Sequence, residues 1–259
     1  MLAKLLRGIW SAPKLTQQSY WCPVCDSKQT TFSPLPKFYL KNALHYGFKH
    51  LENAEMLSLR AYACPKCGAS DRERLYALWI DQQIKKNLFP KCARVIHFAP
   101  EAALSRKLKE LSQFDYKTAD LLRNDVDYKV DIMDMPFDDK YFDVFLCSHV
   151  LEHVENDDRA IKELHRITKP GGCGILIAPI IMGLKKTLED PSITEEADRW
   201  KFYGQNDHVR LYAHDDYVKK IRSHNFLIEE LGENYFGEEV FGLLGLTRTS
   251  ILYIVNKQI

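Results

Sequence analysis

The stretch VIHFAPEAALSRKLKEL, residues 95–111, decides how the second half of this 259-residue chain is interpreted. It starts with an apolar run typical of a buried strand and continues through a tight turn into an amphipathic helix. A strand, a turn and a helix in this order often form the start of a site for a nucleotide-type cofactor. The turn contains no glycine, so the question is what binds there, if anything.

Strand-like and helical segments alternate from about Lys91 to the end of the sequence. The strand-like segments are ARVIHFA, DYKTADL, YFDVFLCS, CGILIAPI, FLIEELGE and TSILYIVNK. This order predicts an α/β fold with a Rossmann-like, mostly parallel sheet and helices on both faces. No helical pattern separates the last two segments, so we expect them to form a C-terminal antiparallel hairpin.

The first part of the chain has a different pattern, with two C-x-x-C motifs and no alternation of strands and helices. The motifs contain Cys22, Cys25, Cys64 and Cys67. Two such turns complete a tetrahedral Zn²⁺ shell, and a closed shell of four thiolates indicates a structural ion. We therefore expect a zinc-ribbon-like segment with a helical linker in residues 1–90 and the α/β domain in residues 91–259. The long stretch between the motifs must loop out or form elements of its own.

Three basic residues lie beside the second motif: Lys66, Arg72 and Arg74. Zinc segments of this kind often bind nucleic acid or protein, and these side chains could contact such a partner. We favour the alternative that the arginines lie on the solvated first turns of a helix from about Asp71 to Lys86.

The composition is that of a globular protein close to electrical neutrality. Its formal net charge is +1, so no overall field attracts it to nucleic acid or to an acidic membrane. No apolar run reaches the roughly 18 residues that a membrane span needs. For MLAKLLRGIW, residues 1–10, we expect a frayed or docked helix, with a membrane-surface anchor as the alternative. Metal-binding cysteine pairs are typical of a reducing compartment, which predicts a cytoplasmic location.

Further residues give the second half a family resemblance. The turn at residues 95–111, an aspartate ending the next strand, the run DIMDMPFDDKYFDVFLCSHVLEHV at 131–154 and a later KPGG occur in succession. This succession resembles a class I S-adenosylmethionine-dependent methyltransferase and is similar to the small-molecule branch that includes the quinone-biosynthesis methyltransferases. The resemblance covers residues 91–257. It implies a seven-stranded sheet, S-adenosylmethionine as cofactor and methyl transfer to O, N or C of a small or medium-sized acceptor.

The family's first turn usually has an acidic residue followed by three alternating glycines. Laid onto that pattern, His97 takes the acidic position, and Ala99, Glu101 and Ala103 take the three glycine positions. The departure is tolerable because the second glycine of dinucleotide enzymes admits a pyrophosphate, which S-adenosylmethionine lacks. Glu101 could bind the cationic amino group in place of the absent acid. The alternative is that Glu101 only favours the start of the helix.

The resemblance also implies a set of cofactor-binding residues at the ends of strands. Asp120 lies about twenty residues after the turn, where a carboxylate can accept both ribose hydroxyls. Asp131, followed by Ile132, matches the family's adenine-edge position, with Asp134 as a competitor. The expected cofactor-binding residues are His97, Phe98, Ala99, Pro100, Glu101, Asp120, Leu121, Asp131, Ile132, Ser148 and His149.

The segment SHVLEHV contains two histidines one helical turn apart, His149 and His153. Both rings can lie on one face. His149 either lines the methyl-transfer pocket or makes local hydrogen bonds, whereas we expect Glu152 and His153 to cap the short helix. The segment lacks the motifs of ordinary adenine-N6 and cytosine-C5 methyltransferases, so those reactions are not expected.

An insertion at residues 180–217 starts at the carboxyl end of a strand and is dense in polar groups. We expect a lid or an acceptor pocket there, with a solvated loop as the alternative. In DHVRLY, alternate side chains share one face if the chain is extended, and such a row could orient an anionic or hydroxylated acceptor, with His208 as candidate base. The expected catalytic residues are His149, His208, Arg210 and Tyr212.

Two other functions stay open at this point. One is an RNA methyltransferase whose zinc segment delivers the substrate, although sparse basic clustering makes nucleic acid a less favoured partner than a small-molecule acceptor. The other is a non-catalytic, zinc-dependent binding protein on a degenerate methyltransferase fold, because the first turn has no glycine. The acceptor, the methylated atom and the oligomeric state do not follow from the sequence.

Overall fold

A seven-stranded sheet runs through the centre of the structure, a computed structural model that describes residues 19–259. In spatial order the strands are β11 (Phe226–Leu231), β12 (Leu252–Lys257), β7 (Thr168–Ile177), β6 (Phe142–Ser148), β3 (Ala93–Phe98), β4 (Phe114–Asp120) and β5 (Tyr128–Lys129). Only β12 runs antiparallel to its neighbours in this sheet. The predicted α/β fold is therefore confirmed. The expected helix at residues 1–10 lies outside the described residues.

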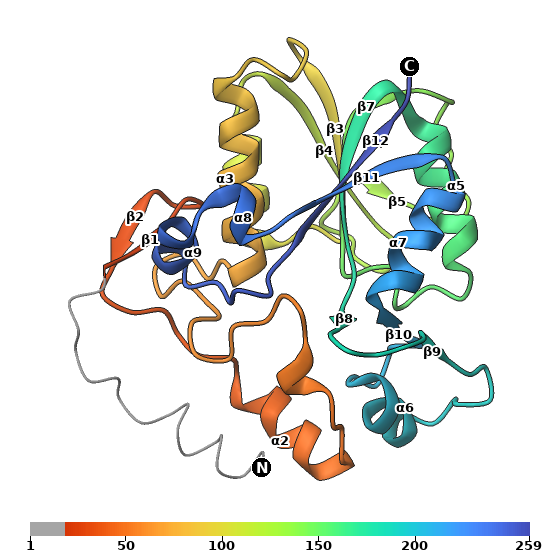
Figure 1. Ribbon diagram of the computed structural model, residues 1–259. Coiled ribbons are helices and arrows are strands. Elements are labelled where there is room, and N and C mark those ends of the chain that lie inside the picture. The colour runs from red at the N-terminus through yellow and green to blue at the C-terminus, as the bar shows by residue number, and fades with distance from the viewer. Residues whose placement is uncertain (1–18) are drawn as a thin grey trace.

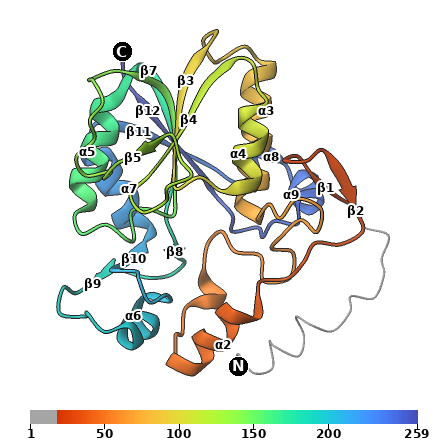
Figure 2. The ribbon, with the colours of Figure 1, turned by 180° about the vertical axis from the view of Figure 1, so that it is seen from behind.

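Helices cover both faces of the sheet. Figures 1 and 2 show α3 (Asp71–Lys85) and α4 (Ala102–Lys109) on one face, and α5 (Asp157–Ile167) and α7 (His214–Ser223) on the other. Strands covered on both faces are apolar along nearly their whole length, which explains the buried runs of β3 and β6. Parallel strands linked by helices place all their carboxyl ends at one edge, where ligands bind in such folds.

The C-terminal strand pair differs from the expectation in its connection. β11 and β12 pair antiparallel, as predicted. However, the expectation that no helix separates them is wrong, because α8 (Glu233–Phe236) and α9 (Glu238–Leu244) lie between them. Both helices are short, and this stretch holds several glycines, which weaken a helical pattern in the sequence. α9 packs against the N-terminal segment and α3.

The N-terminal segment forms small elements around the two cysteine motifs. The first motif follows directly on the short hairpin strand β1 (Tyr20–Cys22), which pairs with β2 (Ser27–Gln29). The stretch between the motifs forms α2 (Lys37–Tyr46) and the 3-10 turn η1 (Leu51–Asn53), so it does have elements of its own. The second motif leads into α3, which Ser70 and Glu73 start with a capping box.

The insertion after β7 folds into a small sheet and a helix. Its strands are β8 (Ile180–Ile181), β9 (Leu188–Glu189) and β10 (Arg210–Ala213), and its helix is α6 (Glu196–Tyr203). α6 packs against α2, where the rings of Trp200 and Tyr46 stack with centroids 5.8 Å apart. Two segments far apart in the sequence thus lie side by side below the sheet (Figures 1 and 2). None of the helices in residues 19–259 is long and apolar enough to cross a membrane.

Candidate active site

The turn after β3 adopts a backbone conformation that glycine usually supplies. Ala99 has a φ of +46°, in the left-handed region, and its N–H donates to the carbonyl of Ala119 at 2.9 Å. For a residue with a Cβ this conformation costs roughly 1 kcal/mol. The chain therefore makes the tight turn without glycine. Because β3 pairs in parallel with β4 and β6, the residues that follow these three strands lie at one edge of the sheet.

A buried chain of polar contacts starts at this turn. His97 is fully buried, with Nδ1 2.8 Å from the Tyr116 hydroxyl and Nε2 2.8 Å from a Glu101 oxygen. Nε of Arg72 lies 3.5 Å from the other Glu101 oxygen. Burial opposes ionisation of Glu101, but the bond to His97 and the charge of Arg72 outweigh it and lower its pKa to about 2. Glu101 makes no side-chain cap bond to α4, and its carboxylate instead contacts His97 and Arg72.

The other expected cofactor residues lie along the same edge. Oδ1 of Asp120, at the end of β4, accepts the N–H groups of Leu122 and Arg123 at 2.7 and 2.9 Å. Asp131 is partly buried next to the buried Ile132. The competing Asp134 has a side chain that is 82% exposed.

Ser148 and His149 end β6 at the centre of this edge. The Ser148 hydroxyl is buried 3.0 Å from that of Tyr76. His149 has a φ of +55° and lines a cavity of about 400 Å³. The expected residues near β3, β4 and β6 are therefore neighbours in space.

The cavity lies beyond the carboxyl ends of β6 and β7. Its wall comes from the sheet edge, from residues before the sheet and from the insertion. The polar side chains of this wall include His149, Glu152, Glu55, Arg72, Asp207 and His208. The insertion, for which we expect a lid or an acceptor pocket, thus lines a cavity. That an acceptor binds there stays a prediction. We call the lining residues outside the central sheet the roof of the cavity. One part of this roof belongs to the insertion, and the other part lies before the sheet in the sequence, where the sequence pattern did not indicate it.

Arg210 and Tyr212 lie outside the cavity, which corrects the expected row of acceptor-binding side chains. Arg210 is buried and donates to three carbonyls, among them Leu151 at 2.6 Å, and it pairs with Glu189 at 2.6 Å. The Tyr212 hydroxyl donates to Asp157 at 2.6 Å. These side chains join the insertion to the loop after β6 and to α5. Only His208 of the row lines the cavity.

The basic residues after the second cysteine motif also differ from the expectation. Arg74 is fully buried, donates to four backbone carbonyls and lies over the ring of Phe32 at 3.9 Å. Arg72 is mostly buried against Glu101. The expectation of solvated arginines is therefore wrong, and both join the N-terminal segment to the rest of the molecule.

Sequence reasoning missed two acidic residues in the cavity. Glu55 is 2% exposed and accepts the Tyr253 hydroxyl at 3.0 Å, and burial raises its pKa to about 7 despite that bond. It lies in an irregular segment, so no periodicity could have identified it. Glu152 is fully buried rather than a helix cap. Its position between two histidines in SHVLEHV was the available signal.

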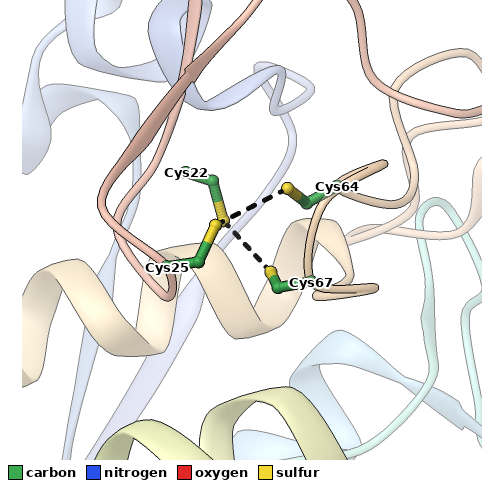
Figure 3. A group of neighbouring side chains, drawn as sticks. All are labelled: Cys22, Cys25, Cys64 and Cys67. Atoms are coloured by element: carbon green, nitrogen blue, oxygen red, sulfur yellow. Dashed lines mark hydrogen bonds between the residues drawn. The ribbon is translucent and has the colours of Figure 1, made fainter.

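The four cysteines of the two motifs converge (Figure 3). The sulfurs of Cys22 and Cys67 are 3.7 Å apart, and those of Cys25 and Cys64 are 3.9 Å apart. A tetrahedral ion with Zn–S bonds of about 2.3 Å requires sulfur separations of about 3.8 Å. The donor set and its spacing therefore fit zinc.

Comparison with known proteins agrees with this geometry. Residues 86–176 match a family model described as a methyltransferase domain. The chain is similar to a demethylmenaquinone methyltransferase of Chlorobaculum tepidum, with 43% identity over 47 residues that cover 18% of this chain and 19% of the relative. It is also similar to the ubiquinone/menaquinone biosynthesis C-methyltransferase UbiE of Francisella tularensis, with 31% identity over 100 residues that cover 34% of this chain and 39% of the relative.

The matched regions thus span two fifths or less of these relatives' own length. Among solved structures, the chain is similar to the YcgJ protein from Bacillus subtilis, with a TM-score of 0.43, 13% identity and coverage of 70% of this chain and 98% of that one. The family match spans β3 to β7 and contains the glycine-free turn and SHVLEHV. Residues 86–176, which hold the first turn and its strand edge, are therefore similar to a methyltransferase domain.

Proposed function

We propose that this protein transfers a methyl group from S-adenosylmethionine to a small or medium-sized acceptor held in the cavity. The observation that carries the proposal is the position of His149, which ends the strand edge with the expected cofactor residues and also lines the cavity. Donor and acceptor would then meet at this residue. The relatives' names concern quinones, and the partly apolar cavity suits an aromatic ring with oxygen substituents.

The cofactor residues of the proposal lie at or just after the carboxyl ends of four neighbouring strands, β6, β3, β4 and β5. Bound S-adenosylmethionine would supply an electrophilic methyl group. We assign Asp120 to its ribose hydroxyls, Asp131 and Ile132 to its adenine, and Glu101 to its amino group. Glu101 already faces His97 and Arg72, so the amino group would have to share this carboxylate. The turn residues Phe98 to Pro100, together with Leu121 and Ser148, complete the proposed site.

Methyl transfer depends mainly on holding the reactants in contact and excluding water. A base is worth about 10²–10⁴-fold where the acceptor must lose a proton. Glu55 lines the cavity, and its pKa of about 7 suits proton transfer near neutral pH. Burial lowers the pKa of His208 to about 4, so Glu55 is a better candidate base than His208.

We also propose that the cysteine cluster binds structural zinc, and that residues 1–90 and 91–259 act as a bracing part and a methyltransferase part. The bracing part packs into the same hydrophobic core as the sheet. Cysteine thiolates kept for a metal are typical of a reducing compartment, which supports the proposed cytoplasmic location. The burial of Arg74 and Arg72 leaves these arginines unable to serve an RNA-delivering surface.

Calorimetric titration of the zinc-loaded protein with S-adenosylhomocysteine tests the proposed cofactor site. We expect micromolar binding to the parent and a loss of at least about tenfold in affinity in Asp120→Ala, because the ribose contacts are removed. Asp115→Ala is the matched control, since Asp115 is exposed near the opposite end of the same strand. A folded parent that does not bind would contradict the proposal and favour a non-catalytic role.

A further inference from the structure

A second group of metal-binding side chains lies in the cavity, apart from the cysteines. Glu152, His153 and His208 each offer one ligand atom, and these atoms lie within 4.8 Å of one another. Nε2 of His153 is 3.8 Å from Oε1 of Glu152, and Nε2 of His208 is 4.0 Å from the same oxygen. Nδ1 of His149 lies 3.2 Å from it.

The buried atoms of this group lack hydrogen-bond partners. In the part of the chain that the structure describes, both carboxylate oxygens of Glu152 and Nε2 of His208 are buried and make no hydrogen bond. Glu152 is 0% exposed and His208 is 2% exposed. A buried carboxylate that is not hydrogen-bonded is strongly destabilising, and a bound cation would offset that cost together with the nearby His149.

The histidine rings are held in the orientation that metal ligands have. Nδ1 of His208 is 3.2 Å from the carbonyl of Tyr203, so it carries the proton and leaves the lone pair of Nε2 directed at Glu152. Nδ1 of His153 is 3.3 Å from Asp207. A ligating histidine nearly always donates its other N–H to a carbonyl or a carboxylate. A lone pair that faces a carboxylate is repelled unless a cation lies between them.

We propose that Glu152, His153 and His208 bind a divalent transition-metal ion inside the acceptor cavity, with His149 beside it. Bonds of about 2.0–2.2 Å place two ligands of one ion up to about 4.4 Å apart, which matches the two nitrogen–oxygen distances. Imidazole favours zinc, iron, cobalt or nickel over magnesium and calcium, which prefer oxygen alone. Three protein ligands leave coordination positions open towards the cavity.

The substrate class that follows rests on the proposed methyltransferase function. Open positions on such an ion suit an acceptor that carries a hydroxyl group, whose acidity the ion increases. Methylation then forms an O–CH₃ bond as the S–CH₃ bond breaks, and the hydroxyl proton passes to Glu55, which lines the same cavity. Hydroxylated rings fit both the ion and the apolar lining.

The test is a Co²⁺ titration of the full chain whose cysteine cluster has first been filled with zinc, followed by visible absorption and by calorimetry. We expect one additional equivalent to bind, with weak d–d bands and no thiolate charge-transfer band. Glu152→Gln and His153→Gln should each weaken this uptake by at least about tenfold. His153 is partly exposed, so its variant keeps the test valid if Glu152→Gln fails to fold.

His224→Gln is the matched control, because this histidine also faces a carboxylate, Asp158 at 2.8 Å, but lies outside the cavity. Its Co²⁺ uptake should equal that of the parent. No additional equivalent, uptake with a thiolate band, or equal uptake by all three variants would each overturn the site. Titration of the same samples with S-adenosylhomocysteine tests the proposed methyltransferase function separately, since metal uptake does not require cofactor binding.

Discussion

Glu55 lines the cavity, and its ionisation makes the free energy of unfolding depend on pH. It is buried among Tyr253, His214 and Glu230, and its pKa of about 7 in the folded state exceeds the ordinary value of 4.5. The folded state therefore holds a proton that the unfolded state releases between these values. Stability is then greatest below the lower value and falls as the pH rises through the higher one.

Glu55→Gln should consequently raise the free energy of unfolding at about pH 8 by about 3 kcal/mol and leave it nearly unchanged at about pH 4. The amide resembles the protonated carboxyl and carries no charge to bury. Urea unfolding at the two pH values measures the difference. Glu52→Gln, at an exposed position of η1, should change neither value. A gain that is equal at both pH values would rule out a raised pKa as its cause.

At the residue scale, the sequence predicts local chemistry better than it predicts neighbours. The cysteines could be identified because each motif depends only on its own spacing. Arg210 and Tyr212 could be placed on one strand face, but alternation does not reveal what packs against that face, which is the loop after β6 and the start of α5. Nothing in the sequence placed Glu55 or Arg72 at the cavity, since tertiary contacts alone bring them there.

At the element scale, the segment that holds the four cysteines is joined to the turn after β3 through α3 and α4. Arg106 of α4 donates to the carbonyl of Cys67 at 3.1 Å. Glu73 of α3 accepts the N–H of Leu104, near the start of α4, at 3.2 Å. The second cysteine motif leads directly into α3. These contacts join the segment that holds the four cysteines to the helix that follows the turn.

Removal of zinc should weaken S-adenosylhomocysteine binding by about tenfold or more, because metal binding and folding of such segments are coupled. Cys64→Ser or a strong chelator removes the zinc, and calorimetry measures the affinity for S-adenosylhomocysteine. Cys173→Ser is the matched control, since Cys173 lies on β7 away from the cluster. Unchanged affinity in folded, zinc-free protein would show that the two elements are independent.

The elements themselves could be predicted where the pattern is long. The six strand segments and the antiparallel last pair follow from apolar runs and their order. α8 and α9 were missed because they have only four and seven residues, with Gly237 between them. Neither helix gives a hydrophobic period long enough to be recognised.

At the scale of the whole molecule, α2 and α6 pack together and each lines the cavity, α2 with Tyr39 and Ala43 and α6 with Tyr203. Tyr46 stacks on Trp200 with an interplanar angle of 9°, and Phe38 packs edge-on against the same indole. No local pattern could predict this contact, since the two helices lie in different halves of the sequence. The sequence indicates the part of the roof that belongs to the insertion. It does not indicate the part that comes from residues before the sheet.

Tyr46→Ala should loosen both helices together. Loss of the stacked ring removes about 0.5–1.5 kcal/mol in addition to its buried area. Hydrogen exchange should therefore become faster in α2 and α6 and stay unchanged in β3, β6 and β7. Tyr235→Ala, which removes an exposed tyrosine against Phe236 on α8, should leave α2 and α6 as they are. Faster exchange in α2 alone would mean that the two helices are not coupled.

The divided roof has a consequence for inheritance. The strand edge proposed for the methyl donor comes from one continuous part of the chain, whereas the roof comes from two parts that flank it in the sequence. If a related protein keeps the methyl donor but binds a new acceptor, both parts of the roof must change, because each supplies one side of the contact between α2 and α6. Exchange of α6 by itself would leave Tyr46 without its ring partner. Substitutions in α2 and α6 should therefore be inherited in pairs, while the strand edge between them in the sequence stays constant.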